Sequence, residues 1–243
     1  LNQMLSRIEE SFAARTESES KLRRFVADAS HELRTPLTSI RGFAELHRQG
    51  AVPEGEKTKE LISRIEKESM RMGSLVEDLL MLARIDQSRE IVMADVDLST
   101  LIKEAVSSSQ AAGPEHPITS DIAHDVHTQG DADKIYQVVT NLLANARAHT
   151  PAGTQIHVAT YSNEDGSYIT VADKGPGLTT ENQKHIFERF YRADPSRVRT
   201  DGEGTGLGLS IVEAVMRAHA GEVSVESELG KGATFTLFFP LSA

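Results

Sequence analysis

The stretch FVADASHELRTPLTSIRGFAEL, residues 25–46, places a titratable imidazole inside a segment with helical character. His31 is followed by the carboxylate of Glu32, and Thr35 and the helix breaker Pro36 come within about one helical turn. A neutral imidazole is a nucleophile near pH 7, and an adjacent carboxylate can accept its proton. A single histidine on a helix is more often a surface or core residue, so this stretch alone leaves both interpretations open.

A glycine-rich stretch, GEGTGLGLS at residues 202–210, leads into a predicted helix. Backbone N–H groups and the helix dipole at such an N-terminus favour a phosphate. The stretch is not a Walker A loop, because no Gly-Lys-Ser/Thr ends it, and it does not fit the dinucleotide-binding register. A tight packing turn would explain the glycines as well.

Two further patterns carry polar side chains that suit a nucleotide. Asp173 ends a predicted strand in DKGPGL and could accept a hydrogen bond from an exocyclic amine such as that of adenine; a solvated turn aspartate is the alternative. Asn141 and Asn145 are four residues apart and share a helix face. Their amide oxygens could ligate a hard cation such as Mg²⁺, or the amides could act as caps or network members.

The composition restricts the classes of protein that remain. The chain has 243 residues, a formal net charge of −10 and no cysteine. An acidic balance argues against non-specific nucleic-acid binding, and the lack of cysteine excludes disulfides and thiolate catalysis. No apolar run approaches the ~18 residues needed to span a membrane. We therefore expect a soluble chain of one or two domains without a nucleic-acid partner.

The first part of the chain predicts two long antiparallel helices, because apolar residues recur at steps of three and four and a turn signal, RQGAVPEGEK, separates them. The two seams are Val26, Ser30, Leu33, Leu37, Ile40 and Ala44, and Leu61, Ile65, Glu68, Met72, Leu75, Leu79 and Leu82. Such a hairpin cannot cover its own apolar stripe. We expect a homodimer with a four-helix bundle; a monomer whose hairpin packs on the rest of the chain is the alternative.

From about Asp95 the pattern changes to mixed α/β. Helices are predicted over 97–110, with Asp97 as the N-cap, over 131–150 and over 206–221. Strands are predicted where apolar and polar residues alternate, at 155–162, 167–173, 222–228 and 232–240. The expected fold is a two-layer α/β sandwich with a mostly antiparallel sheet.

The order of these motifs carries a resemblance. SHELRTPL, the two asparagines, Asp-x-Gly-x-Gly, IFERFYR and GTGLGLSIV follow one another as in the catalytic core of a two-component sensor histidine kinase, which the chain resembles from about Leu22 to Leu241. The resemblance implies the end of a HAMP-like linker at 1–20, a dimerisation and histidine phosphotransfer domain at 21–90, and a Bergerat-type ATP-binding domain at 95–243.

The resemblance implies roles for the first helix. His31 matches the phosphoacceptor, and Glu32 would accept the proton from one ring nitrogen while the other attacks the γ-phosphate. Thr35 matches the residue that supports phosphatase activity on a phosphorylated regulator; a tolerated polar residue before Pro36 is the alternative. Pro36 would give the bundle a soft point for signalling, or is only a tolerated kink.

The resemblance also implies roles in the second domain. Asn145 matches the Mg²⁺ ligand, and Asn141 stands where related ATPases carry a catalytic glutamate. Asp173 matches the acceptor of the adenine amine, with Gly175 and Gly177 permitting the approach. Phe187, Phe190 and Tyr191 resemble the hinge of a lid over about 179–204, and Arg192 the lid arginine aimed at the γ-phosphate. The residues expected to close over the phosphates are Gly204, Thr205, Gly206, Leu207 and Gly208.

One position departs from the family pattern. Ala148 stands where a lysine often follows the magnesium asparagine, and His149 takes the place of an aromatic residue beside the adenine. Arg147 is the candidate for the missing positive charge, although a neighbouring helical residue points ~100° away.

The activity implied is ATP- and Mg²⁺-dependent autophosphorylation of His31, followed by phosphotransfer to an aspartate of a response regulator and by dephosphorylation of that regulator. The location implied is the cytoplasmic face of the cell membrane, through an N-terminal sensor and transmembrane part that precedes this chain. A kinase-dead nucleotide-binding scaffold and a gyrase-like ATPase are the rival classes; Asn141 and the His31 hairpin argue against the second.

Overall fold

The computed structural model describes residues 2–51, 53, 55–86, 92–193 and 205–241, with side chains from Arg23 onward. The chain divides into two compact units, Leu1–Leu79 and Leu80–Ala243, which are considered separately. Within the described residues, no helix combines the length and the apolar character that a membrane span requires.

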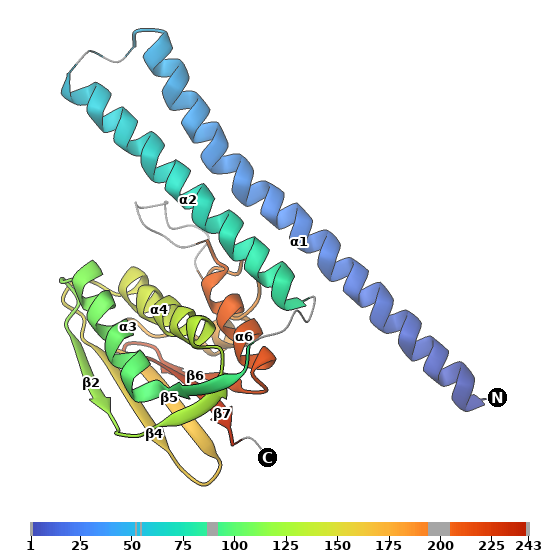
Figure 1. The fold of residues 1–243 in the computed structure, drawn as a ribbon. Coiled ribbons are helices and arrows are strands. Elements are labelled where there is room, and N and C mark those ends of the chain that lie inside the picture. The colour runs from blue at the N-terminus through green and yellow to red at the C-terminus, as the bar shows by residue number, and fades with distance from the viewer. Residues whose placement is uncertain (1, 52, 54, 87–91, 194–204, 242–243) are drawn as a thin grey trace. The chain divides into compact units, whose positions relative to one another are not determined.

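The first unit is a helical hairpin, as the seams predict. Helix α1 (Asn2–Arg48) and helix α2 (Glu56–Asp86) run antiparallel (Figure 1). Pro36 lies inside α1, and the helix continues through it. Leu61 and Leu75 of the second seam are buried, whereas Val26 and Leu37 of the first seam are 55% and 56% exposed within the single chain. The hairpin alone therefore leaves part of its apolar surface uncovered.

The second unit contains a five-stranded sheet with strand order β2-β4-β5-β7-β6. Its strands are β2 (Ile118–Ile122), β4 (Ile156–Ser162), β5 (Gly166–Asp173), β6 (Glu222–Glu228) and β7 (Gly232–Pro240). All neighbouring pairs are antiparallel except β2 and β4. Strands β1 (Ala94–Asp97) and β3 (His127–Gly130) form a separate antiparallel pair. The four strands predicted by alternation are present, and β1, β2 and β3 were not predicted.

Helices α3 (Leu98–Ala112), α4 (Ala132–His149) and α6 (Gly208–Ala218) form the second layer (Figure 1). Each buries an apolar stripe against the sheet or its neighbours, with Ile102, Leu142 and Ile211 fully buried. A short helix, α5 (Thr180–His185), follows β5. The predicted two-layer α/β sandwich is thus confirmed.

The helix N-termini are satisfied by side chains that the sequence displays. Asp97 accepts a hydrogen bond from the Thr100 amide at 3.1 Å, which confirms the predicted cap of α3. Asp131 caps α4 through the Lys134 amide at 3.2 Å, and Thr179 caps α5. Each carboxylate or hydroxyl satisfies an amide that the helix itself leaves without a partner.

A buried histidine joins α6 to the start of α4. The Nε2 atom of His219 accepts a hydrogen bond from the Asp131 amide at 3.0 Å, and Nδ1 lies 2.8 Å from the Val215 carbonyl oxygen. The ring packs edge-on against Phe239. These contacts require the tautomer with its proton on Nδ1, and they fix the relative position of the two helices.

Candidate functional site

Helix α4 contacts the predicted site near its middle and at its C-terminal end. Near its middle, the Asn141 amide lies 3.5 Å from the Gly208 carbonyl oxygen at the start of α6. At its C-terminal end, Thr150 lies so close to Gly175 that a Cβ added there would meet Thr150 Cγ2 at 2.4 Å. These two positions are separated by about 13 Å of helix rise, and the half-buried Asn145 lies between them. Helix α4 therefore links the two parts of the candidate site. We call the start of α6 the glycine-rich end of the site, and the turn after Asp173 the aspartate end.

The aspartate end is built on the last residue of β5. The half-buried Asp173 accepts a hydrogen bond from the Gly175 amide at 2.8 Å through Oδ1. Burial raises the pKa of Asp173, while hydrogen bonds from the Gly175 and Ala233 amides and the charge of His149 act in the opposite direction. A carboxylate kept partly out of water in this way is a strong acceptor for a ligand N–H group.

The glycines after Asp173 are needed by the turn itself. Gly177 has φ +70°, and a Cβ there would meet the Glu228 carbonyl oxygen at 2.1 Å. Gly232 lies against Asp173 in the same way, with its Cβ position 1.9 Å from the Asp173 carbonyl oxygen. Close approach of protein backbone thus accounts for Gly177, whereas the expected approach of a ligand at Gly175 and Gly177 stays a prediction.

The glycine-rich end is the N-terminus of α6. Unlike α3, α4 and α5, this helix has no capping hydrogen bond from the side chain of its N-cap residue, because that residue is Leu207. A Cβ added to Gly208 would meet no atom within 4 Å, so the space beside the first turn is open. Gly206 has φ +73° and accepts a hydrogen bond from the Phe190 amide at 2.9 Å. Thr205 Oγ1 accepts from the Leu207 amide at 3.3 Å, and the predicted Gly204 lies outside the described residues.

The segment after α5 is held by aromatic side chains. Phe187 contacts the ring of Phe235 edge-on with 6.4 Å between centroids, and the Tyr191 hydroxyl donates to Asn182 Oδ1 at 3.0 Å. Phe190 has φ +62°, an uncommon value for a residue with a side chain. Arg192 is half-buried, and its expected role at a γ-phosphate stays a prediction.

His185 was not singled out from the sequence. Its Nδ1 lies 2.6 Å from Glu188 Oε1 and its Nε2 lies 3.2 Å from Glu181 Oε1. The hydrogen bond with Glu188, followed by that with Glu181, raises the pKa of His185. Acidic residues three positions after and four positions before a histidine on a helix are the signal that would have found this group.

Arg147 does not lie with the other predicted binding residues. Its Nη1 donates to the Ser109 carbonyl oxygen at 2.6 Å and to Ser109 Oγ at 2.9 Å, near the C-terminal end of α3. A cation is favoured there by the helix dipole and by the carbonyl groups of the last turn. This placement argues against the hypothesis that Arg147 replaces the missing lysine, because its position in α4 directs the side chain towards α3.

His31 is exposed on α1 in the first unit, and its neighbour Glu32 is half-buried. Thr35 Oγ1 lies 3.3 Å from the His31 carbonyl oxygen, four residues back along the helix. Both side chains therefore project from one helical face, as their spacing predicts. Exposure is the condition that a histidine must meet to accept a group from another domain or from a partner.

The described residues fit a nucleoside triphosphate. The half-buried Asp173 suits an amine of a base, and the uncapped N-terminus of α6 with open space at Gly208 suits a phosphate. No cluster of three or more His, Cys, Asp or Glu side chains in the described ranges could hold a metal by itself. A Mg²⁺ ion would take oxygen from the Asn145 amide and from phosphate groups, the type of ligand that it prefers.

Replacing Arg147 by alanine should lower the free energy of unfolding of the second unit by about 2 kcal/mol, because two hydrogen bonds from a charged donor are lost. Nucleotide affinity should stay within about twofold, because the guanidinium is engaged at α3. Chemical denaturation and calorimetric titration measure the two quantities.

Arg217→Ala is the matched control, because Arg217 is 75% exposed on α6 and forms a surface ion pair with Glu213 at 3.3 Å. Such a surface pair contributes little to stability. Loss of nucleotide affinity in Arg147→Ala without loss of stability would restore the lysine-replacement hypothesis.

Two family models match the chain. Residues 21–88 match the His Kinase A (phospho-acceptor) domain, and residues 130–243 match the histidine kinase-, DNA gyrase B- and HSP90-like ATPase. The probable sensor histidine kinase TcrY of Mycobacterium tuberculosis is 47% identical over 95% of this chain and 48% of its own length. The sensor histidine kinase RppB of Synechocystis is 35% identical over 93% of this chain and 50% of its own length. The chain thus spans about half the length of these curated relatives.

Solved structures show the same fold. ShkA, solved at full length in complex with AMPPNP, aligns with a TM-score of 0.65 and 28% identity over 90% of this chain and 47% of its own. The histidine kinase AdeS of Acinetobacter baumannii aligns with a TM-score of 0.69 and 23% identity over 88% of this chain and 98% of its own. The motif order, the hairpin followed by the ATPase-type sandwich, and the two matched models agree: the chain belongs to the sensor histidine kinases of two-component systems and carries their phospho-acceptor and ATPase domains.

Proposed function

We propose that this chain is the ATP-dependent kinase core of a two-component sensor, with the phosphotransfer domain at 21–90 and the catalytic domain at 95–243. The observation that carries the proposal is the pairing of an exposed His31 on the hairpin with a sandwich that has an uncapped glycine-rich helix N-terminus and a half-buried Asp173. The chain resembles ShkA, whose structure was solved with AMPPNP, which supports a nucleotide as the ligand.

In the proposed reaction, one nitrogen of His31 attacks the γ-phosphorus of ATP. The bond from that phosphorus to the β–γ bridging oxygen breaks, ADP leaves, and Glu32 accepts the proton from the other nitrogen. Asp173 accepts from the adenine amine, beside Gly175, Gly177 and His149. Residues 205–208 bind the phosphates through the start of α6, together with Gly204, which lies outside the described residues.

Mg²⁺ held by Asn145 would neutralise phosphate charge, and Arg192 would stabilise the transferring group. Asn141 is an amide that bonds to Gly208, and an amide cannot deprotonate water. This choice of side chain suits an enzyme that delivers its phosphate to a histidine and not to solvent.

We propose a homodimer formed through the hairpin. Among the described side chains of the first unit, six large apolar ones are at least two-fifths exposed in the single chain: Val26, Leu37, Leu46, Ile62, Met70 and Val76. Their burial by a second copy would complete a four-helix bundle and would remove this surface from water. The proposed partner in phosphotransfer is the receiver domain of a response regulator. The N-terminal helix, including the HAMP-like residues 1–20, would continue from a membrane sensor and place the chain at the cytoplasmic face.

His31→Gln should abolish autophosphorylation and leave ATP affinity unchanged, because the acceptor and the nucleotide site lie in different domains. The assay uses γ-labelled ATP with Mg²⁺ and tests whether the label on the protein is labile to acid and stable to alkali, as a phosphohistidine is. His47→Gln is the control, since His47 is another exposed histidine of α1. Acid-labile label retained on His31→Gln would refute the assignment, and ATP hydrolysis without any label would favour the gyrase-like alternative.

Asp173→Asn should weaken ATP binding roughly ten- to hundredfold, because a charge-assisted hydrogen bond is lost. The same change should not destabilise the fold at neutral pH. Because the pKa of Asp173 is raised in the folded state, its ionisation above about pH 4 opposes folding, and the neutral amide removes that cost.

Calorimetry with ATP and thermal unfolding without it measure these two effects. Asp165→Asn, an exposed acid in the β4–β5 turn, is the control. A lower melting temperature together with lower affinity would show that Asp173 is a structural turn residue.

Thr35→Ala should keep autophosphorylation within a few-fold and lose most dephosphorylation of the regulator, because a hydroxyl beside His31 can hold the attacking water in line. Thr38→Ala is the matched control: Thr38 Oγ1 bonds to the Arg34 carbonyl oxygen at 2.8 Å, as Thr35 bonds to that of His31, but it lies outside the Glu-x-x-Thr pattern. The decay of phosphorylated regulator with ADP measures the activity. Equal decay with Thr35→Ala and wild type would reduce Thr35 to a tolerated polar residue.

A further inference from the structure

Among the described residues, strand β1 has a single strand neighbour. It pairs only with β3, in the register Ala94↔Gly130 to Asp97↔His127, and this pair is separate from the five-stranded sheet. Of the β1 side chains, Val96 is the buried one. The strand follows α2 in the chain after residues 87–93 only. Its attachment therefore decides where the connection between the hairpin and the sandwich ends.

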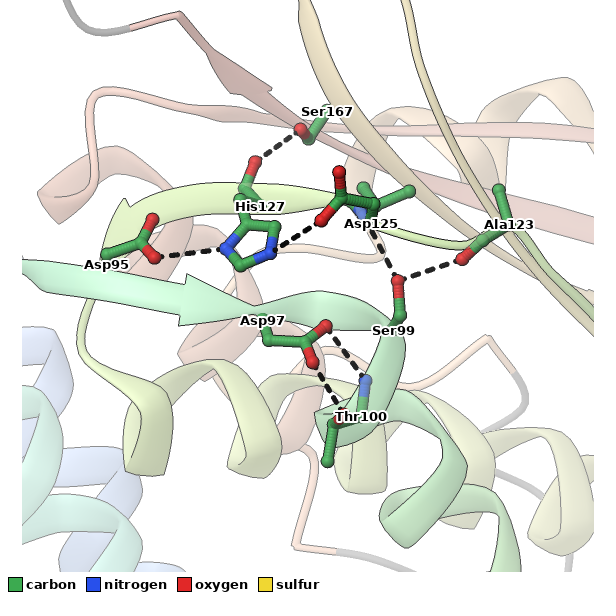
Figure 2. A network of polar contacts seen from close by, with 9 residues as sticks. Asp95, Asp97, Ser99, Thr100, Ala123, Asp125, His127 and Ser167 are labelled. Carbon is green, nitrogen blue, oxygen red and sulfur yellow. Dashed lines mark hydrogen bonds and ion pairs between the residues drawn. The ribbon is translucent and has the colours of Figure 1, made fainter.

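A histidine of β3 faces three carboxylates at this attachment (Figure 2). His127 Nδ1 lies 3.0 Å from Asp95 Oδ2 of β1, and Nε2 lies 3.3 Å from Asp125 Oδ1 in the turn before β3. Asp97 is the cross-strand partner of His127 in the register. Each ring nitrogen thus lies beside a different carboxylate. The carboxylate at Nδ1, that of Asp95, belongs to β1.

The neighbouring contacts do not depend on the charge of His127. Ser99 Oγ donates to the Ala123 carbonyl oxygen at 2.8 Å and accepts from the Val126 amide at 3.1 Å. Ser167 Oγ of β5 donates to the His127 carbonyl oxygen at 2.7 Å, and Asp97 is engaged with Thr100 at the start of α3 (Figure 2). The turn before β3 and the start of α3 therefore stay in place while the imidazole changes its charge.

The protonation of His127 changes what the imidazole can hold. A neutral ring has one N–H donor, so one of its nitrogens must direct a lone pair at a carboxylate. A charged ring donates to Asp95 and, at the same time, forms an ion pair with Asp125. The hydrogen bond with Asp95, with the charges of Asp125 and Asp97 in addition, raises the pKa of His127 against a smaller effect of burial. Among the described residues, Asp95, Asp125 and Asp97 are the charged groups that act on His127. Strand β5 and the start of α3 contribute the uncharged hydroxyls of Ser167, Ser99 and Thr100.

We propose that His127, Asp95 and Asp125 form a proton-dependent latch that fastens the linker strand β1 to the catalytic sandwich when the imidazole is charged and loosens it when the imidazole is neutral. Because the folded pKa is raised, the stabilisation is complete below the unfolded value of about 6.5 and is lost as pH rises through the folded value. The latch is thus closed in mildly acidic solution and weakened in alkaline solution.

A loosened β1 would lengthen the connection to α2. Residues 94–96 add about 10 Å of reach when they are released, because Asp97 stays in place as the N-cap of α3. This consequence rests on the proposed function, in which the catalytic domain must reach His31. The burial of Val96 also helps to hold the strand. The charge of His127 therefore changes how often β1 is released, but it is not the only interaction that holds the strand in place.

Hydrogen exchange of the β1 amides at two pH values tests the latch in the whole chain without nucleotide. The rates of His127→Gln and wild type are compared at the same pH, so the intrinsic chemistry of exchange cancels. At about pH 5.5 the wild-type amides should exchange roughly two- to fivefold more slowly than those of His127→Gln, and at about pH 8.5 the two should be equal. Equal rates at pH 5.5, or a ratio that is unchanged at pH 8.5, would overturn the proposal.

His127→Lys is the matched variant, because an ammonium group stays charged over this range. Its β1 amides should exchange more slowly than those of His127→Gln by a similar factor at both pH values. A ratio that varied with pH as it does in wild type would assign the effect to another group. Autophosphorylation measured on the same samples distinguishes a failure of the latch from a failure of the proposed kinase function. A wild-type chain that shows the exchange pattern without phosphorylation would contradict the kinase function and leave the latch intact.

A second measurement leaves His127 in place. The midpoint of its NMR titration should fall in Asp95→Asn and in Asp125→Asn. It should not change in Asp121→Asn, since Asp121 lies 3.5 Å from the different imidazole of His157. Unchanged midpoints in both of the first two variants would contradict the latch.

Discussion

The hydrogen bond between the Asp131 amide and His219 Nε2 holds together the two helices on which the nucleotide site depends. It joins the first turn of α4 to the end of α6, inside the core and against Phe239. A buried polar contact of this kind is costly to leave unmade, so it permits one arrangement of the helices. With that arrangement set, Asn141 reaches Gly208, and the start of α6 lies beside α4.

Two groups of the candidate site, the N-terminus of α6 and the carboxylate of Asp173, are less well stabilised than comparable groups around them. Helices α3, α4 and α5 begin with a capping side chain, and α6 does not. Asp173 is held where burial disfavours its charge. A chain selected for stability alone would cap the helix and neutralise the acid. Retaining both groups is consistent with a ligand that supplies the missing partners, an anion at α6 and a hydrogen-bond donor at Asp173.

The motifs could be predicted because they depend on neighbours in the sequence. Asp97 as a cap, the spacing of Asn141 and Asn145 on one helix face, and the alternation in β5 and β7 are local patterns with a period, and each is present in the structure. The short strands β1 and β3 were not predicted. ADVD and HTQG have no run of apolar residues, and they are strands because each offers backbone partners to the other across more than 25 positions.

The sequence by itself determined the order of the parts. These are a helical hairpin that carries His31, a helix that carries Asn141 and Asn145, a strand that ends in Asp173, and a helix with a glycine-rich N-terminus. The tertiary structure alone decided what each side chain contacts. Arg147, the candidate from the family resemblance for the missing positive charge, is bound to Ser109. His127, which was not singled out from the sequence, lies beside carboxylates from two segments. The reason is physical: periodicity gives the direction of a side chain from its own helix or strand, and the group that it meets belongs to a distant segment brought there by the packing of the core.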